Sequence, residues 1–224
     1  MPIYNARIVN IDPVETRRYA GLHKSEKFDE QIIISACEDA QLLIDVRGIW
    51  KMYDYDCKSQ TVLADSPFKI EGKSITKHLE GCEKVICIAV TVGEAIENEV
   101  TNRFKIGEYV SSMLLDAAAT TAVEQAADIM EKAITQEIAR DGYTMRWRFS
   151  PGYGDWALTQ QPALFKLTGA EEIGIKLSAA MMMIPRKSIT AIIGLVKNKG
   201  DGKKNKTSHN CEACDKTDCP SRQN

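Results

Sequence analysis

One long helical segment dominates this sequence. Residues 94–140 carry apolar side chains at helical spacing, and Gly107 predicts a break near the start of the segment. The expected core residues of this segment are Met113, Ala117, Val123, Ala127, Met130 and Ile134. Just before it, residues 85–92 are almost wholly apolar and β-branched, which is typical of a strand buried on both faces. A helix of this length beside a buried strand predicts one large core in a mixed fold.

Shorter elements surround this pair. The sequence predicts helices at residues 28–43, 74–81 (with Ser74 before and Gly81 after) and 160–167, and strands at 48–56, 67–71, 143–149 and 188–196. Helices and strands mix without a regular β-α-β repeat. We therefore predict an α+β fold with a mixed or antiparallel sheet and long helices, and not a doubly wound sheet.

The composition changes abruptly after residue 196. Residues 197–206 consist largely of Lys, Asn, Gly and Asp, which cannot bury enough apolar surface to fold alone. The predicted organisation is a folded domain at 1–196, a flexible basic linker at 197–208 and a cysteine-rich tail at 209–224. The lysines of the linker can touch phosphates, but a solvated linker is the favoured interpretation.

The charge balance excludes several classes of partner for the chain as a whole. With 29 basic and 31 acidic residues the formal net charge is -2, so there is no general bias toward nucleic acid or an anionic membrane. No apolar run reaches the roughly 18 residues that cross a bilayer, and residues 1–11 lack the build of a signal peptide. We expect a cytoplasmic protein.

The seven cysteines fall into two groups. Cys37, Cys57, Cys82 and Cys87 are scattered among apolar residues, where a reduced cysteine behaves as a small buried hydrophobe. The other three lie close together near the end of the sequence. That clustering predicts a metal site.

The tail reads His209-x-Cys211-x2-Cys214-x4-Cys219-Pro220. Two thiolates separated by two residues can grip one metal, and thiolates select zinc or iron-sulfur clusters. Zinc would take His209 as its fourth ligand, whereas a cluster would use the three cysteines with His209, a remote cysteine or a partner's residue. Both alternatives stay open, as does a tail without metal.

The loop at residues 148–156, RFSPGYGDW, is the most informative in the domain. Arg148 lies at the end of the strand predicted for 143–149, whose polar face also holds Thr144 and Arg146, and a fixed guanidinium suits bidentate binding of a carboxylate. Gly152 lets the backbone approach a ligand, and Tyr153 offers a flat apolar face. The loop predicts a pocket for a small molecule with an anionic head. The alternative is an ordinary turn with an arginine salt bridge.

A specific resemblance adds to this interpretation. The R-x-x-P-G-Y pattern of Arg148, Pro151, Gly152 and Tyr153, followed by AMMMIPRKSITAIIGL at residues 180–195, resembles the activation domain of cobalamin-dependent methionine synthase. The resemblance covers roughly residues 85–196. It implies a domain that binds S-adenosylmethionine.

The resemblance also implies roles for individual residues. Arg148 would hold the methionyl carboxylate, and Glu124 on the long helix would contact the amino group. The remaining pocket residues that it implies are Ser150, Gly152, Tyr153, Ile193 and Gly194. Ile193 and Gly194 replace the family's aromatic pair, so only their backbone contacts could transfer. The family's N-terminal aspartate has no convincing counterpart.

The function implied is reactivation of a corrinoid enzyme. Because the chain has no cobalamin-binding module, it would act on the cobalamin of a separate corrinoid protein or methionine synthase. There it would support reductive methylation of cob(II)alamin, with electrons from flavodoxin, ferredoxin or a cluster in the tail. The protein's role would be to position the sulfonium methyl group without a general base, since His23, His78 and His209 all lie outside the loop. The alternatives are a non-catalytic docking module for a corrinoid protein and a metal-tailed nucleic-acid-binding protein.

Overall fold

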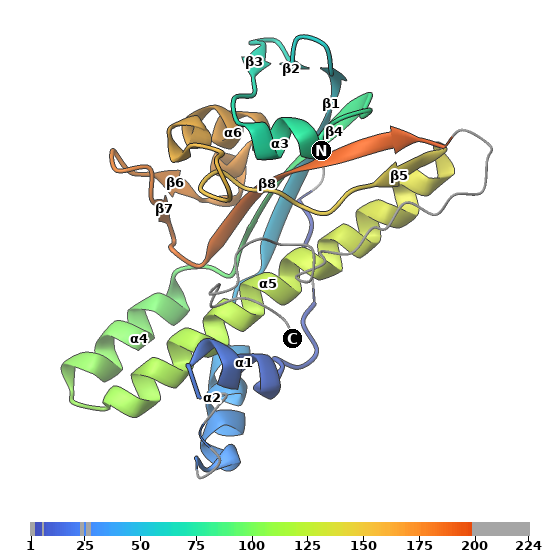
Figure 1. Ribbon diagram of the computed structural model, residues 1–224. Coiled ribbons are helices and arrows are strands. Elements are labelled where there is room, and N and C mark those ends of the chain that lie inside the picture. Colours follow the sequence, from blue (N-terminus) through green and yellow to red (C-terminus); the bar gives the residue numbers. More distant parts are fainter. Residues whose placement is uncertain (1–2, 6, 23–24, 26–27, 199–224) are drawn as a thin grey trace.

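The computed structural model describes residues 3–5, 7–22, 25 and 28–198. Helices and strands follow one another without a repeating unit, and Figure 1 shows their arrangement. The helices are α1 (Pro13–Tyr19), α2 (Glu30–Leu43), α3 (Lys73–His78), α4 (Ala95–Lys105), α5 (Tyr109–Arg140) and α6 (Gln161–Thr168), with short 3-10 turns at Leu158–Gln160 and Ala170–Ile173. The strands are β1 (Arg47–Asp56), β2 (Thr61–Leu63), β3 (Phe68–Lys69), β4 (Lys84–Thr91), β5 (Tyr143–Met145), β6 (Lys176–Leu177), β7 (Met183–Ile184) and β8 (Ser188–Lys197).

Six strands form one sheet in the order β3-β2-β1-β4-β8-β5. Every pairing in it is antiparallel, and Ile88 at its centre lies opposite Trp50 on β1 and Ala191 on β8. Strands β6 and β7 form a separate antiparallel pair. The predicted α+β class is confirmed, and the apolar run at residues 85–92 is the central strand β4, buried on both faces.

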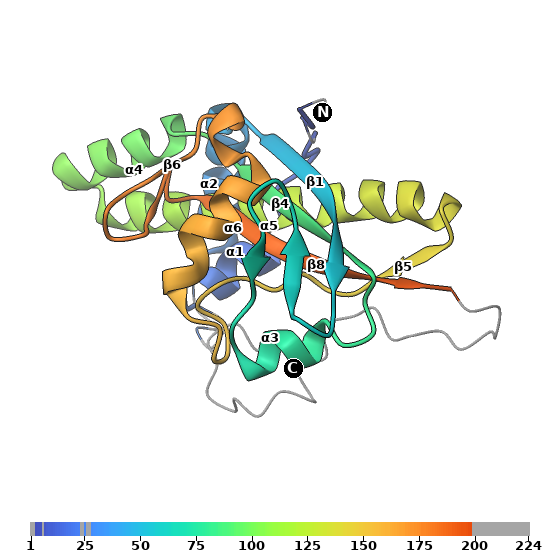
Figure 2. The ribbon, with the colours of Figure 1, turned by 90° about the horizontal axis from the view of Figure 1, so that it is seen from above.

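The two faces of the sheet carry different helices. One face packs against α5 together with α1, α2 and α4, and its core includes Ile88, Ile193 and Met130. The other face packs against α3, α6 and the loop that precedes α6, with Leu79 and Trp156 in its core. Figure 2 shows α5 and α3 on opposite sides of the strands. Each fully buried side chain of this size contributes about 1.5 to 3 kcal/mol, so both layers stabilise the sheet.

Helix α5 packs closely because its buried face is rich in alanine. Ala118, Ala122 and Ala126 are fully buried there. The predicted break near Gly107 is confirmed. Gly107 adopts a φ of 88°, and the Glu108 amide donates to the Arg103 carbonyl at 2.9 Å, which ends α4 in the way typical of a glycine-terminated helix.

Several sequence predictions were wrong in detail. Met113 is 42% exposed and not a core residue, because it lies close to the α4–α5 turn, at the end of α5 that projects away from the sheet. The short helix α3 follows Gly72 and not Ser74. The strand predicted for residues 143–149 ends at Met145, and residues 67–71 contribute only the two residues of β3. Helix α1 and strand β2 were not predicted.

The scattered cysteines lie largely in the core. Cys37, Cys82 and Cys87 are buried, as predicted, and Cys57 is half-buried. Burial raises the pKa of the Cys82 thiol to about 11, so this cysteine stays protonated and apolar. Within the described part of the chain, none of the helices combines the length and apolar character that crossing a bilayer requires. The predicted tail, with His209, Cys211, Cys214 and Cys219, and nearly all of the predicted linker lie outside the described residues.

Candidate functional site

A β-bulge sets the position of Arg148. Strand β5 pairs with β8 so that Met145 lies opposite Leu195, and this register would place Phe149 opposite Ala191. Phe149 instead lies opposite Ile192, with mutual backbone hydrogen bonds of 2.9 and 2.8 Å. The segment between Met145 and Phe149 therefore contains one extra residue. Such bulges re-aim side chains and are common beside functional sites.

The bulge sends the two arginines of this segment in different directions. Arg146 donates to the carbonyls of His78 and Glu80, at the end of α3. Arg148 instead reaches helix α5 on the other face of the sheet. The predicted period of two over residues 143–149 is therefore wrong, because the extra residue breaks the alternation that would have placed both arginines on one face.

Arg148 meets three carboxylates on α5. Its Nη2 donates to Glu124 at 2.7 Å, and its Nη1 donates to Asp128 at 2.6 Å and to Glu131 at 2.5 Å. The three acids are spaced by four and then three residues, so they lie along one face of the helix. The predicted proximity of Arg148 and Glu124 is present, and it takes the form of a direct ion pair.

The cluster carries an excess of negative charge. Three carboxylates around one guanidinium leave two negative charges uncompensated when all are ionised. Burial by itself would lower the pKa of Arg148, but Glu131 and Asp128 raise it above its ordinary value, so the guanidinium stays charged. Burial raises the pKa of Glu131, and the attraction of Arg148 opposes this only in part. The site is therefore polarised to receive a positively charged group.

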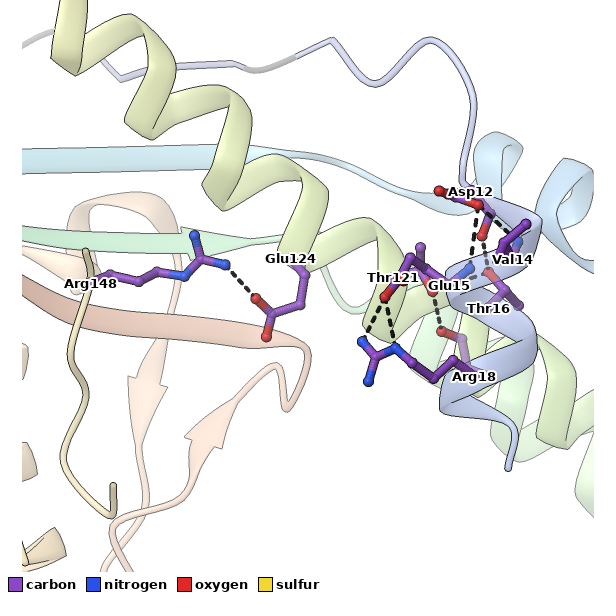
Figure 3. A network of polar contacts seen from close by, with 9 residues as sticks. Asp12, Val14, Glu15, Thr16, Arg18, Thr121, Glu124 and Arg148 are labelled. Atoms are coloured by element: carbon purple, nitrogen blue, oxygen red, sulfur yellow. Dashed lines mark hydrogen bonds and ion pairs between the residues drawn. The ribbon is translucent and has the colours of Figure 1, made fainter. Parts of the chain in front are cut away.

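Helix α1 packs beside Thr121 of α5, one helical turn before Glu124, as Figure 3 shows. Asp12 begins the helix by accepting the amide hydrogens of Val14 and Glu15, and the Thr16 hydroxyl donates to Thr121 of α5 at 3.1 Å. Burial raises the pKa of Tyr19, and the negative charge of Glu124 adds to this effect. The end of α1 therefore lies close enough to Glu124 for its charge to act on Tyr19.

The loop after Arg148 is tightly braced. The Gly152 amide donates to the Trp156 carbonyl at 2.8 Å, and Gly152 has a φ of 94° that side chains disfavour. Trp156 is buried and donates its Nε1–H to Gln160 at 2.6 Å. The Asp155 carboxylate accepts the amide hydrogens of Lys73 and Ser74, each at 2.8 Å, so the loop also caps α3. These bonds hold the loop without any ligand.

An aromatic cluster lies under the same loop. His78 packs against Trp147 and Phe149 with ring centroids 4.0 and 5.5 Å apart, and its Nε2–H donates to the Trp147 carbonyl at 2.9 Å. Burial lowers the pKa of His78 to about 4, so the ring is neutral at pH 7. His78 supports the segment that carries Arg148 from behind, on the face of the sheet opposite the carboxylates.

The other predicted site residues occupy separate environments. Tyr153 is 62% exposed, and Ser150 accepts the Tyr153 amide hydrogen through its carbonyl. The Gly152 amide, already bonded to Trp156, has no hydrogen left for a ligand. Ile193 is buried in the core on the α5 side of β8, whereas Gly194 faces Leu79 and Cys82 on the other side. The structure thus brings Arg148 and Glu124 together but sends Ile193 and Gly194 to opposite faces.

Sequence reasoning missed Asp128 and Glu131. The signal was present as an acidic face of α5, with Asp116, Glu124, Asp128 and Glu131 at helical spacing. At the other end of this face, Lys187 binds Asp116 and the Thr120 hydroxyl, each at 2.9 Å. The acidic face thus binds two cations of the protein itself, Arg148 and Lys187. Among the described residues no group of three or more His, Cys, Asp or Glu side chains is arranged to hold a metal ion.

A separate apolar cavity lies on another face of α5. Its volume is about 270 Å³, and it is lined by Ile3, Tyr4, Trp50, Met130, Ala133, Ile134 and Glu137. None of these residues contacts Arg148. The cavity and the charged cluster are therefore distinct features.

Fold and site together define an α+β domain in which a bulged segment presents an arginine to an acidic helix. The structure resembles a solved structure described as the MetH reactivation domain bound to AdoHcy, with a TM-score of 0.59 and 13% sequence identity over 92% of this chain and 81% of that chain. At this identity the likeness establishes the fold, which agrees with the resemblance found in the sequence. No protein-family model and no curated protein matches the sequence.

Proposed function

We propose that this protein binds S-adenosylmethionine beside Arg148 and supports the reductive methylation of cob(II)alamin on a separate corrinoid protein. The observation that carries the proposal is the direction in which the Arg148 side chain points. A bulge turns it toward three carboxylates of α5, in a fold similar to that of a domain whose structure contains AdoHcy. Arg148, Glu124 and the braced loop at residues 150–156 are the proposed binding residues.

The charge of the cluster fits this ligand. S-adenosylmethionine carries a sulfonium, an ammonium and a carboxylate, which leave one net positive charge. The cluster has two uncompensated negative charges, so it attracts the ligand as a whole. S-adenosylhomocysteine lacks the sulfonium charge and is neutral overall. We expect the site to prefer the methylated form.

A ligand carboxylate that takes both N–H groups of one terminal nitrogen of Arg148 requires an exchange of partners. Both terminal nitrogens already donate to carboxylates, so such a ligand replaces the present partner of one of them. Glu124 alone occupies Nη2, whereas Asp128 and Glu131 share Nη1. Replacement of Glu124 releases a whole nitrogen, and the freed carboxylate can accept the ligand ammonium. The exchange leaves neither Arg148 nor the Glu124 carboxylate without a partner of opposite charge.

The chain's contribution to the chemistry is to position the ligand. Fixing the ligand's head at Arg148 and Glu124 restricts the directions in which the sulfonium methyl group can point, and orientation lowers the barrier of a group transfer. No proton needs to be moved in this step, and His78 is neutral and buried behind the loop. The electrons would come from flavodoxin, ferredoxin or a cluster bound by Cys211, Cys214 and Cys219.

Calorimetry with two neighbouring arginine variants tests the binding step. Arg148→Ala should weaken S-adenosylmethionine binding at least about tenfold, because it removes a charged partner from a desolvated site. Arg146→Ala is the matched control, since Arg146 lies two residues away and bonds α3 on the other face. It should leave the affinity unchanged. Equal losses in both variants would remove Arg148 from the site.

Arg148→Ala leaves three carboxylates without their cation and can impair folding, so a second variant tests the same site independently. Glu124→Gln keeps the shape of the side chain and removes one negative charge. It should weaken S-adenosylmethionine more than S-adenosylhomocysteine, because only the former carries the sulfonium charge. An equal change for both ligands would contradict the proposed charge complementarity.

The methylation step is tested with a corrinoid protein in the cob(II)alamin state, S-adenosylmethionine and a low-potential reductant. The protein should accelerate the appearance of the methylcobalamin absorption spectrum. If the tail holds a cluster, replacing Cys211, Cys214 and Cys219 with Ser should abolish the rate without flavodoxin, whereas with a zinc tail the flavodoxin-assisted rate should survive. Ligand binding without any methylcobalamin would favour a docking module.

A further inference from the structure

The turn between α4 and α5 carries a cluster of exposed apolar side chains, here termed the hairpin tip. Its members are Phe104, Ile106, Tyr109, Val110 and Met113, which are 62%, 71%, 61%, 52% and 42% exposed. Phe104 and Tyr109 touch across the turn in an edge-on arrangement with ring centroids 5.0 Å apart. Five large apolar residues within ten positions are therefore exposed at the end of the hairpin.

The tip stands on a rigid base. The Ser112 hydroxyl donates to the Val100 carbonyl at 2.8 Å, which ties the two helices together. Arg103 adds an ion pair to Glu99 at 2.9 Å, a second to Asp39 of α2 at 2.8 Å, and a hydrogen bond to Ser111. The apolar surface is therefore held in one shape before any partner binds, which reduces the entropy lost on binding.

The tip projects away from the rest of the molecule. In Figures 1 and 2 the α4–α5 turn lies at the end of the hairpin farthest from β5, clear of the sheet. A surface at this position can meet a partner without displacing any other element. It is also remote from the Arg148 cluster, which contacts α5 from Glu124 onward.

The area of the tip suits a particular kind of interface. With roughly 150 to 200 Å² of accessible surface for each side chain of this size, the measured exposures leave on the order of 500 Å² of apolar surface. This lies at the upper end of what single soluble proteins leave exposed. Complete contact between two tips would bury at most about 1,000 Å², which is the lower bound of a specific protein interface.

The charged residues beside the hairpin tip favour a second copy of the chain as its binding partner. Lys105 and Glu108 flank the turn with opposite signs, and within the described residues neither side chain forms an ion pair. Under a two-fold axis, Lys105 of one copy would meet Glu108 of the other. A patch with one charge of each sign complements itself, whereas an anionic membrane surface would call for a cluster of unpaired basic residues.

We propose that the protein forms a two-fold dimer through the hairpin tips of two copies. Apolar side chains from Phe104 to Met113 form its centre, and the pairs of Lys105 with Glu108 close its rim. This assembly is independent of the proposed ligand site. It leaves the Arg148 face of both copies open.

Sedimentation velocity of the full chain over a range of micromolar concentrations tests the dimer. The wild-type protein should show a monomer–dimer equilibrium. Ile106→Glu should raise the dissociation constant of the dimer by about tenfold or more, as expected for a central interface residue. Leu63→Glu is the control, since Leu63 is 52% exposed on β2, which lies next to the edge strand β3 of the sheet. It should leave the equilibrium unchanged.

A charge exchange tests the two-fold pairing itself. Lys105→Glu should weaken the dimer, and adding Glu108→Lys in the same chain should restore it. A wild-type protein that stays monomeric overturns the proposal, and so does a dimer that tolerates Ile106→Glu. Monomers that sediment with vesicles of neutral phosphatidylcholine would identify the tip as a membrane contact and would likewise overturn it.

Discussion

Protonation of His78 should loosen the segment that carries Arg148. The His78 ring is only 8% exposed and lies between the end of α3 and the rings of Trp147 and Phe149. Its Nε2–H donates to the Trp147 carbonyl, which lies directly before Arg148 in the sequence. Burial penalises the charged ring and lowers the pKa of His78 from 6.5 to about 4. Protonation therefore places a charge in this buried contact, where burial and the nearby Arg146 oppose it although the bond to the Trp147 carbonyl favours it.

The sign and size of the effect follow from the two pKa values. The unfolded chain takes up the proton near pH 6.5, whereas the folded protein takes it up only near pH 4. The contribution of His78 to stability is therefore complete above pH 6.5 and is lost as the pH falls toward 4. Between pH 7 and pH 5 the loss in the free energy of unfolding is about 2 kcal/mol.

Urea unfolding at pH 7 and pH 5 measures this loss. His78→Gln is the matched variant, because its amide still offers a hydrogen to the Trp147 carbonyl but does not titrate. The wild-type protein should lose about 2 kcal/mol more than the variant between the two pH values. Glu131, whose pKa burial raises, changes stability in the opposite direction, and it is present in both proteins. Equal losses would refute the assignment of a buried neutral ring, as would a ring proton signal of His78 that titrates near pH 6.5.

Two further predictions concern the segments that brace the site. Gly194→Ala should destabilise the domain by about 1 to 3 kcal/mol in urea unfolding, because the added Cβ would lie 2.6 Å from Cys82 Sγ and 2.9 Å from Leu79 Cδ2. Adding Cys82→Ala should recover part of this loss, and no recovery would show that another contact is responsible. Asp155→Ala should lower the midpoint of unfolding and increase hydrogen exchange at the Lys73 and Ser74 amides, since both donate to this carboxylate; unchanged exchange at these amides would contradict its role as the cap of α3.

Local patterns predicted the elements that pack at the centre of the molecule. The run at residues 85–92 has apolar side chains on both faces, so it had to be buried on both, and it is the central strand β4. The break at Gly107 was predictable because a glycine ends a helix by its own backbone conformation. The proximity of Arg148 and Glu124 came from a resemblance to a known family. It could not have come from spacing, because 23 residues and a turn separate them.

Tertiary packing decided which way the critical side chains point. Alternation along residues 143–149 predicts Arg146 and Arg148 on one face, but the pairing of Phe149 with Ile192 adds a residue and separates them. Met113 fits the helical stripe, yet it is exposed because it lies close to the α4–α5 turn, at the end of α5 away from the sheet.

The sequence by itself determined the class of fold, the long interrupted helix and the loop that carries Arg148, since each depends on neighbours within a few residues. Only the tertiary structure decided that Asp128 and Glu131 join Glu124 around that arginine and that the hairpin tip stays uncovered. The physical reason is that a bulge, a helix face and an exposed end are defined by the distance between segments, which a linear pattern does not contain.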